Sequence, residues 1–188
     1  MAEVVTAIPP GGGPQFRPPE PIRATHDLSA FSCTREELNT WLKRRALANE
    51  GPASRTYVVP VGQRVVGYYC LAAGSVNREE LPTAALRRNM PDKAPVVVLG
   101  RLATDRTLEG RGIGTGMLQE AISRMIATGN EIGVRGLLVH ALDQDAAGFY
   151  RKFGFVACSI GDRTLLLPVE TAIRALRAKG NANAASSE

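Results

Sequence analysis

The fold of this chain is determined by one stretch, Val96-Val-Val-Leu-Gly-Arg-Leu-Ala-Thr-Asp-Arg-Thr-Leu-Glu-Gly-Arg-Gly-Ile-Gly-Thr-Gly-Met-Leu118. The apolar run over 95–103 predicts a strand that is covered on both faces. Glycines then alternate at positions 110, 112, 114 and 116, directly before an amphipathic helical pattern. Because the first amides of a helix lack intrahelical partners and carry the positive end of its dipole, this arrangement predicts a phosphate site.

The spacing of these glycines excludes two common phosphate loops. It does not fit Gly-x-Gly-x-x-Gly, because Thr115 or Met117 stands at the last position. A Walker loop is also excluded, since no Gly-Lys-Ser/Thr closes the turn. The residues Arg111-Gly-Ile-Gly-Thr-Gly116 instead fit the pattern [Gln/Arg]-x-x-Gly-x-[Gly/Ala].

Strands and helices alternate on both sides of this stretch. The capping-box pattern of Thr34 with Glu37 predicts a helix that continues through Ala46. Further helices are predicted over 78–88, 144–152 and 169–179, and strands over 55–61, 64–73, 136–142, 155–160 and 164–167. A tight turn at Gly62-Gln63 is expected to join the first two of these strands. Such alternation indicates an α/β fold, with a mixed central sheet flanked by helices on both faces.

Length and composition fit one ordinary globular domain. The chain has 188 residues, 44% hydrophobic and 22% charged, which excludes a disordered, collagen-like or fibrous protein. Six of the 12 prolines lie in residues 1–21, so we expect a flexible Pro/Gly-rich tail there. The folded domain is then expected over 22–179 and a disordered C-terminus over 180–188. The net charge of +5 is compatible with a polyanionic partner.

The cysteines and the apolar runs indicate the cellular compartment in which the protein is expected. Cys33, Cys70 and Cys158 lie far apart without a Cys-x-x-Cys pair, so we expect buried free thiols and no metal site. There is no signal-peptide pattern, and no apolar run approaches the ~20 residues of a membrane span. We therefore expect a soluble, cytoplasmic protein with no membrane contact.

The Arg111–Gly116 pattern is similar to the acetyl-CoA signature of GNAT (GCN5-related) N-acetyltransferases. A second similar element runs over 137–155, where a strand and a short helix end in Phe149-Tyr150 before Gly154-Phe155. The N-terminal part resembles one subgroup, the acetyltransferase toxins of type II toxin–antitoxin modules (the TacT/AtaT group). Residues 26–33, 38–42, 55–58, 66–72 and 99–103 carry that resemblance, which covers about residues 24–168.

This resemblance implies a GNAT fold in which a splayed pair of strands binds acetyl-CoA as the co-substrate. It implies that the backbone of Leu102, Ala103 and Thr104 pairs with the pantetheine arm. The pyrophosphate would be wrapped by the loop residues Gly110, Arg111, Gly112, Ile113, Gly114, Thr115 and Gly116.

Acetyl transfer to an amine requires a neutral amine and a proton for the departing thiolate. A free α-amine has a pKa of about 8, so it needs little help from a general base. Neither histidine is an obvious base, because His26 lies near the flexible end and His140 falls within a predicted strand. The resemblance implies that Tyr150 is the general acid. The alternative is that its ring only packs against the pantetheine channel.

Resemblance to the toxins implies that the acceptor is the α-amine of an aminoacyl-tRNA, whose acetylation blocks translation, and that a ribbon-helix-helix antitoxin neutralises the protein. We also expect a homodimer, because two basic faces would form one groove. Two other functions stay open: acetylation of a small-molecule or protein amine, and CoA binding without turnover. The residues expected to contact tRNA phosphates, for each of which the alternative is a solvated helix face, are Lys43, Arg44, Arg45, Arg87, Arg88 and Lys93.

Overall fold

The computed structural model describes residues 16–185, with side chains described up to residue 178. Residues 1–15 of the expected tail and residues 186–188 lie outside the described part. The chain divides into a first unit, Met1–Ala72 with Gly100–Ala121, and a second unit, Ala73–Leu99 with Ile122–Glu188. The division falls inside β3 (Arg64–Asn77), β4 (Lys93–Thr104) and α4 (Ile113–Glu131), so no linker separates the units.

The strands of the first unit follow the order β1-β2-β3-β4. The short β1 (Glu20–Pro21) pairs antiparallel with β2 (Arg55–Val61), so the sheet begins inside the expected tail. The predicted hairpin of β2 and β3 is present, and its tight turn places Gly62 at a φ of 63°. β3 continues to Asn77, four residues beyond the predicted end.

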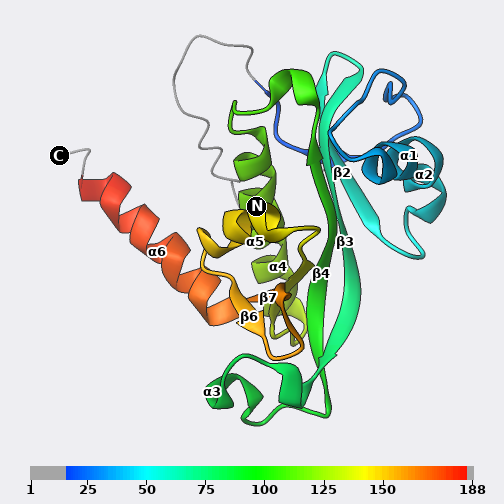
Figure 1. Ribbon diagram of the computed structural model, residues 1–188. Coiled ribbons are helices and arrows are strands. Elements are labelled where there is room, and N and C mark those ends of the chain that lie inside the picture. The colour runs from blue at the N-terminus through cyan, green and yellow to red at the C-terminus, as the bar shows by residue number, and fades with distance from the viewer. Residues whose placement is uncertain (1–15, 186–188) are drawn as a thin grey trace. The chain divides into compact units, whose positions relative to one another are not determined.

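Helices cover both faces of the first unit's strands (Figure 1). α1 (Glu36–Arg44) and α2 (Ala46–Asn49) cover one face, where Phe31, Leu42 and Tyr68 are fully buried. The start of α4 packs on the opposite face, because side chains alternate along a strand and Gly67 precedes Tyr68. A Cβ on Gly67 would lie 3.0 Å from Ile113 Cγ2, so glycine permits this close approach.

The start of α1 corrects the sequence prediction. Its N-cap is Arg35, and no side chain caps it by a hydrogen bond, so the Thr34 capping box is wrong. The buried Asn39 fixes the start instead: its side chain accepts a hydrogen bond from the Cys33 N–H (2.8 Å) and donates one to the Cys33 carbonyl (3.2 Å). The helix also ends at Arg44 rather than continuing through Ala46.

The second unit carries strands in the order β3-β4-β5-β7-β6. β5 (Gly136–His140) pairs parallel with β4, whereas β7 (Gly161–Pro168) pairs antiparallel with both β5 and β6 (Val156–Cys158). This mixture of pairings, with helices against the strands, confirms the predicted α/β fold class. Only glycine fits at position 136, because a Cβ there would collide with the Leu167 carbonyl oxygen.

The helices of the second unit depart from the prediction in two places. The helix expected over 78–88 is broken into η1 (Arg78–Glu80) and α3 (Ala84–Arg87), with Pro82 between them. α5 (Gln144–Arg151) is present as expected, and α6 (Val169–Ala185) extends beyond the expected domain end at 179. A cluster on β3, β4, β5, β6 and β7 includes Val76, Val96, Leu138, Cys158 and Leu166.

Two further findings concern the whole of the described chain. Cys33, Cys70 and Cys158 are buried free thiols. Between residues 16 and 185, no helix combines the length and apolar character required to cross a membrane, and no cluster of three or more His, Cys, Asp or Glu side chains could hold a metal ion.

Candidate functional site

The glycine-rich turn lies in the first unit, between β4 and α4. β4 ends at Thr104, η2 (Arg106–Leu108) follows, and α4 begins at Ile113. Gly110 has a φ of 74° and Gly112 a φ of 81°, in the left-handed region where a Cβ is strained. The backbone of the turn itself therefore requires glycine at both positions.

The space around the turn is open. A Cβ added to Gly110, Gly112 or Gly116 would meet no described atom within 4 Å. A Cβ on Gly114 would lie 3.6 Å from Thr104 Oγ1, which is an ordinary contact. The Gly116 N–H donates to the Gly112 carbonyl (2.9 Å), and the helical amides before it have no intrahelical acceptor. An open backbone cradle at a helix N-terminus, with Arg111 exposed beside it, fits a pyrophosphate group.

The side chains of the last residues of β4 alternate between the two faces of the sheet. Leu102 and Thr104 lie toward α4, since both approach the Gly114 position. Ala103 belongs to the core cluster on the α1 side and is 6% exposed. Because these side chains pack within the protein, an extended ligand along this strand can be held by backbone amides and carbonyls. This arrangement is compatible with the pantetheine role expected for the three residues.

Asp105 anchors the chain where it leaves β4. Its carboxylate is 1% exposed and accepts hydrogen bonds from the backbone N–H groups of Ser32 (3.0 Å) and Thr107 (3.0 Å) and from the Thr107 hydroxyl (2.6 Å). Arg64 Nη2 lies 3.4 Å from the Asp105 carboxylate. Burial pushes the pKa of Asp105 upward, but these hydrogen bonds and Arg64 outweigh burial and lower the pKa. The ionised Asp105 therefore fixes the direction of the turn.

Sequence reasoning did not single out Asp105. The signal was nevertheless present, because Asp followed two residues later by Thr107 is typical of an Asx turn. Its long-range bond to Ser32 joins segments 73 residues apart in the sequence, and no local pattern could have revealed that contact.

Tyr150 lies on α5 in the second unit. Asp143 caps this helix by accepting a hydrogen bond from the Ala146 N–H (2.8 Å). The Tyr150 ring packs against Phe149 and Phe155, with centroid distances of 5.3 Å and 5.4 Å. Within residues 16–185 the Tyr150 hydroxyl has no hydrogen-bond partner. Burial raises the pKa of Tyr150 to about 12, so the phenol keeps its proton at neutral pH and has it available to donate.

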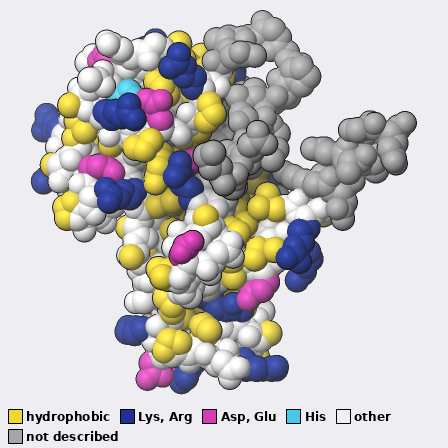
Figure 2. Space-filling view, turned by 180° about the vertical axis from the view of Figure 1, so that it is seen from behind, with side chains coloured by type: hydrophobic (Ala, Val, Ile, Leu, Met, Phe, Trp, Pro, Cys, Tyr) yellow, Lys and Arg dark blue, Asp and Glu magenta, His cyan; other side chains and the backbone are white. Residues whose placement is uncertain are grey.

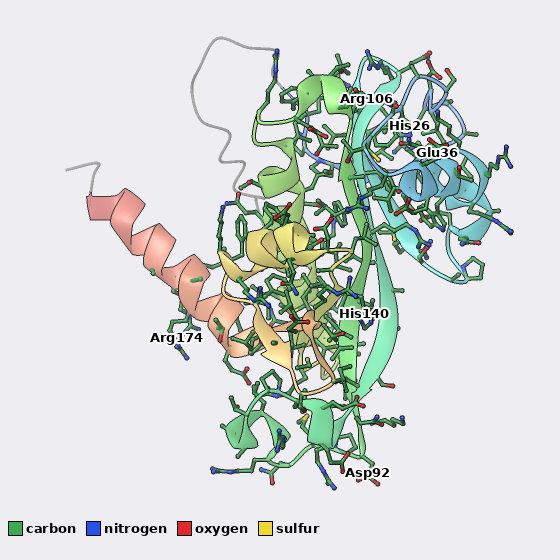
Figure 3. All side chains as sticks on the ribbon, in the orientation of Figure 1. His26, Glu36, Asp92, Arg106, His140 and Arg174 are labelled. Atoms are coloured by element: carbon green, nitrogen blue, oxygen red, sulfur yellow. The ribbon has the colours of Figure 1, made fainter. Side chains whose placement is uncertain are left out.

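The two histidines are held by local contacts (Figure 3). His26 Nε2 lies 2.8 Å from Glu20 Oε1, and His26 Nδ1 accepts a hydrogen bond from the Arg23 N–H (3.0 Å). His140 is the exposed last residue of β5, where its Nδ1 lies 3.1 Å from Thr164 Oγ1. His140 is thus a hydrogen-bonded strand histidine at the surface rather than in the core.

The six basic residues divide between the two units. In the second unit, Arg87 donates twice to the Leu81 carbonyl (3.0 and 2.9 Å), and Lys93 Nζ lies 2.6 Å from Asn77 Oδ1. Arg88 is exposed. On the face that Figure 2 shows, Lys and Arg side chains are scattered among acidic and hydrophobic ones. Three consecutive basic residues of the first unit are all exposed: Lys43, Arg44 and Arg45.

Comparisons with known proteins agree with this geometry. Residues 22–155 match the acetyltransferase (GNAT) family. The chain is 43% identical over 141 residues to the tRNA-acetylating toxin of Mycobacterium tuberculosis (strain ATCC 25618 / H37Rv), an alignment that covers 74% of this chain and 84% of the relative.

Two solved structures are also similar. AtaT complexed with acetyl-methionyl-tRNAfMet has a TM-score of 0.78 and 30% identity, over 84% of this chain and 97% of that one. A tyrosine-to-phenylalanine mutant of the toxin AtaT, bound to acetyl-CoA and the C-terminus of the antitoxin AtaR, has a TM-score of 0.69 and 28% identity, over 82% and 94%. The family match over most of the chain shows that this protein belongs to the GNAT family of acetyltransferases.

Proposed function

We propose that this chain is a toxin that transfers the acetyl group of acetyl-CoA to the α-amine of an aminoacyl-tRNA and thereby blocks translation. The observation that carries the proposal is the 43% identity to a tRNA-acetylating toxin across 74% of the chain. Similarity to AtaT in complex with an acetylated aminoacyl-tRNA supports the same acceptor. The α-amine of such a substrate has a pKa of about 8, so it needs little help from a general base. This suits a protein whose two histidines are held in local contacts.

In this proposal acetyl-CoA lies along the end of β4 and over the glycine-rich turn. The amides from Gly110 to Gly116 bind the pyrophosphate, and the Arg111 guanidinium adds a positive charge. The open space around Gly110, Gly112 and Gly116 supports this assignment. The backbone from Leu102 to Thr104 pairs with the pantetheine arm.

Tyr150 supplies the proton that acetyl transfer consumes. The neutral amine attacks the thioester carbonyl carbon, a C–N bond forms and the C–S bond breaks. The Tyr150 phenol gives its proton to the departing thiolate, and a proton released by the newly bonded nitrogen restores the phenol. The pKa of about 12 keeps the phenol protonated before each turnover, so the proton is present, and it also makes this phenol a weaker acid than a free tyrosine.

The expected partners follow from the same assignment. Lys43, Arg44 and Arg45 contact tRNA phosphates from the first unit, with Arg87, Arg88 and Lys93 as the second group. A second copy of this chain adds its own basic residues, and a ribbon-helix-helix antitoxin neutralises the toxin. Light scattering at micromolar concentration should give twice the 20.1 kDa of one chain. A monomer mass there contradicts the dimer.

The decisive experiment incubates the protein with labelled acetyl-CoA and total charged tRNA. The label should become acid-precipitable and should be released by mild alkali as N-acetyl-amino acid, because the ester to tRNA hydrolyses while the new amide survives. Uncharged tRNA is the control for labelling of the nucleic acid itself. Label on a polyamine or a protein amine, with none on charged tRNA, overturns the proposal. Binding of acetyl-CoA without any transfer identifies a CoA-binding module.

The contribution of the first basic group is tested by reversing two of its charges. Arg44→Glu with Arg45→Glu should weaken binding of charged tRNA and flatten its dependence on salt, since fewer counterions are released. The matched control is Arg174→Glu with Arg177→Glu, which makes the same charge change at exposed positions of α6 (Figure 3 labels Arg174). Equal weakening by both pairs indicates an effect of net charge rather than of contact.

A further inference from the structure

Arg101 is held in place by an aromatic stack in the first unit. Its guanidinium carbon lies 4.3 Å from the centroid of the Trp41 ring, a cation–π contact. Trp41 stacks on Tyr68, with 5.8 Å between centroids and 13° between planes. The Tyr68 hydroxyl donates to the Leu38 carbonyl (2.8 Å), and the Tyr68 ring is fully buried. The Arg101 guanidinium therefore rests on a rigid base and loses little further freedom on binding a ligand.

No acidic side chain of the described part of the chain neutralises the charge of Arg101. Within the described residues Arg101 has no acidic partner, whereas Arg64 pairs with Asp105 and Arg55 with Glu50. Its polar neighbour is the Cys70 thiol. Burial raises the pKa of Cys70 even though Arg101 favours the ionised form, so the thiol stays neutral. A half-buried cation that is fixed but unpaired is suited to bind an anion from outside the chain.

The position of Arg101 along β4 indicates which anion this is. The proposed pyrophosphate site follows the C-terminal end of β4, and the pantetheine arm runs back along Leu102–Thr104. Arg101 directly precedes these residues, so it lies toward the thioester end, away from the phosphates of CoA. The acceptor must approach this end. An anionic group that reaches Arg101 therefore belongs to the acceptor.

We propose that Arg101, stacked on Trp41, binds a backbone phosphate near the 3′ end of the acceptor tRNA and so selects an amine attached to a nucleotide chain over a free amine. The inference rests on the proposed function and adds a specificity-determining residue to it. Guanidinium suits this task because its planar fork can donate two parallel hydrogen bonds to one phosphate.

The test compares two acceptors in Arg101→Gln, Arg101→Lys and the wild type. One acceptor is charged tRNA, and the other is an aminoacyl-nucleoside without phosphate. In Arg101→Gln the ratio of kcat/KM for tRNA to kcat/KM for the nucleoside should fall by about tenfold to hundredfold, the effect of one charged hydrogen bond. The plot of log affinity for tRNA against log salt concentration has a negative slope, and its magnitude should become smaller by about 0.7. Arg101→Lys, which keeps the charge without the fork, should retain the salt slope and show a smaller fall.

The matched control is Arg23→Gln, which removes the same charge from an exposed position of the first unit and should leave the ratio unchanged. An unchanged ratio in Arg101→Gln, with charged tRNA acetylated by the wild type, overturns the inference alone. So does weaker binding of acetyl-CoA with an unchanged ratio, which would assign the anion to CoA. A wild-type protein that acetylates the nucleoside but not charged tRNA overturns the proposed function as well.

Discussion

The glycine-rich turn and helix α5 contribute different parts of the polypeptide to the proposed reaction. The turn offers backbone: two glycines at positive φ, open space around three glycine positions and the first amides of α4. Helix α5 offers one side chain, the Tyr150 phenol, set between Phe149 and Phe155. Changes in the turn should therefore alter the binding of acetyl-CoA, and changes at Tyr150 should alter turnover. This difference makes binding and chemistry separable by mutation.

The largest effect is expected for Tyr150→Phe, which keeps the ring packing and removes only the donated proton. Turnover should fall by about 10²–10⁴-fold, the usual contribution of a positioned acid. The Kd for acetyl-CoA, measured by calorimetry, should stay within about twofold. Phe149→Leu, which disturbs the neighbouring ring but keeps the phenol, is the control for packing. Wild-type turnover in Tyr150→Phe would assign Tyr150 to packing alone.

A smaller effect, on binding, is expected for Gly114→Glu. The structure has room for the Cβ, but the carboxylate brings a like charge to the pyrophosphate site. The Kd for acetyl-CoA should rise by about 10²–10³-fold, since a like-charge contact costs several kcal/mol. Gly133→Glu adds the same charge at an exposed glycine with open space outside the turn and should leave the Kd unchanged. Equal affinity in all three proteins would remove this loop from the acetyl-CoA site.

A third pair of variants compares the effects of two glycines in the turn on stability. Gly112→Ala places a Cβ at a φ of 81° and should destabilise the protein by about 1–2 kcal/mol. Gly116→Ala lies in the first part of α4 with open space around it and should stabilise the protein by up to ~1 kcal/mol. Urea unfolding measures both. Calorimetry should show nearly unchanged acetyl-CoA binding in Gly116→Ala, because the pattern accepts glycine or alanine at this position and a Cβ there meets open space. Destabilisation of both variants would show that the two glycines are equivalent.

The smallest effect is the pH dependence. The pKa of Tyr150 is raised to about 12, so the acid stays in its protonated, active form as the pH rises through the neutral and mildly alkaline range. The acceptor amine, with a pKa of about 8, loses its proton over the same range. The kcat/KM should therefore rise about five- to tenfold between pH 7 and pH 9 and then stay level to about pH 10. A fall before pH 10 that is absent from Tyr150→Phe would contradict the high pKa.

The sequence alone predicted features that depend on local patterns. The apolar run of β4, the turn and α4 follow one another in the expected order, and the hairpin turn at Gly62 was predicted from its glycine. The break at Pro82 could also have been predicted, because proline interrupts a helix. The α1 start was missed because Asn39, a residue inside the helix, bonds to Cys33 ahead of it.

The candidate site was predictable to the extent that a motif carries it. Gly110, Gly112 and Tyr150 stand in recognisable patterns, and each lies in the expected element. Arg101 and Trp41 meet only after folding, when β4 and α1 come together on one side of the sheet. The scattered basic residues likewise show which side chains are exposed but not which of them touch a ligand. Contacts that depend on tertiary packing leave no periodic trace in a sequence.

The stack beneath Arg101 also has a spectroscopic consequence. Trp41 is the single tryptophan of the chain, so selective excitation of indole fluorescence reports on one site only. Trp41 is 8% exposed and its ring contacts the Arg101 guanidinium, which places the emitter in a dry environment next to a charge. When an anion reaches Arg101, the electric field across the indole changes, and the emission should change in wavelength or intensity. The protein thus carries an intrinsic probe with which arrival of the acceptor can be followed in real time, without a label.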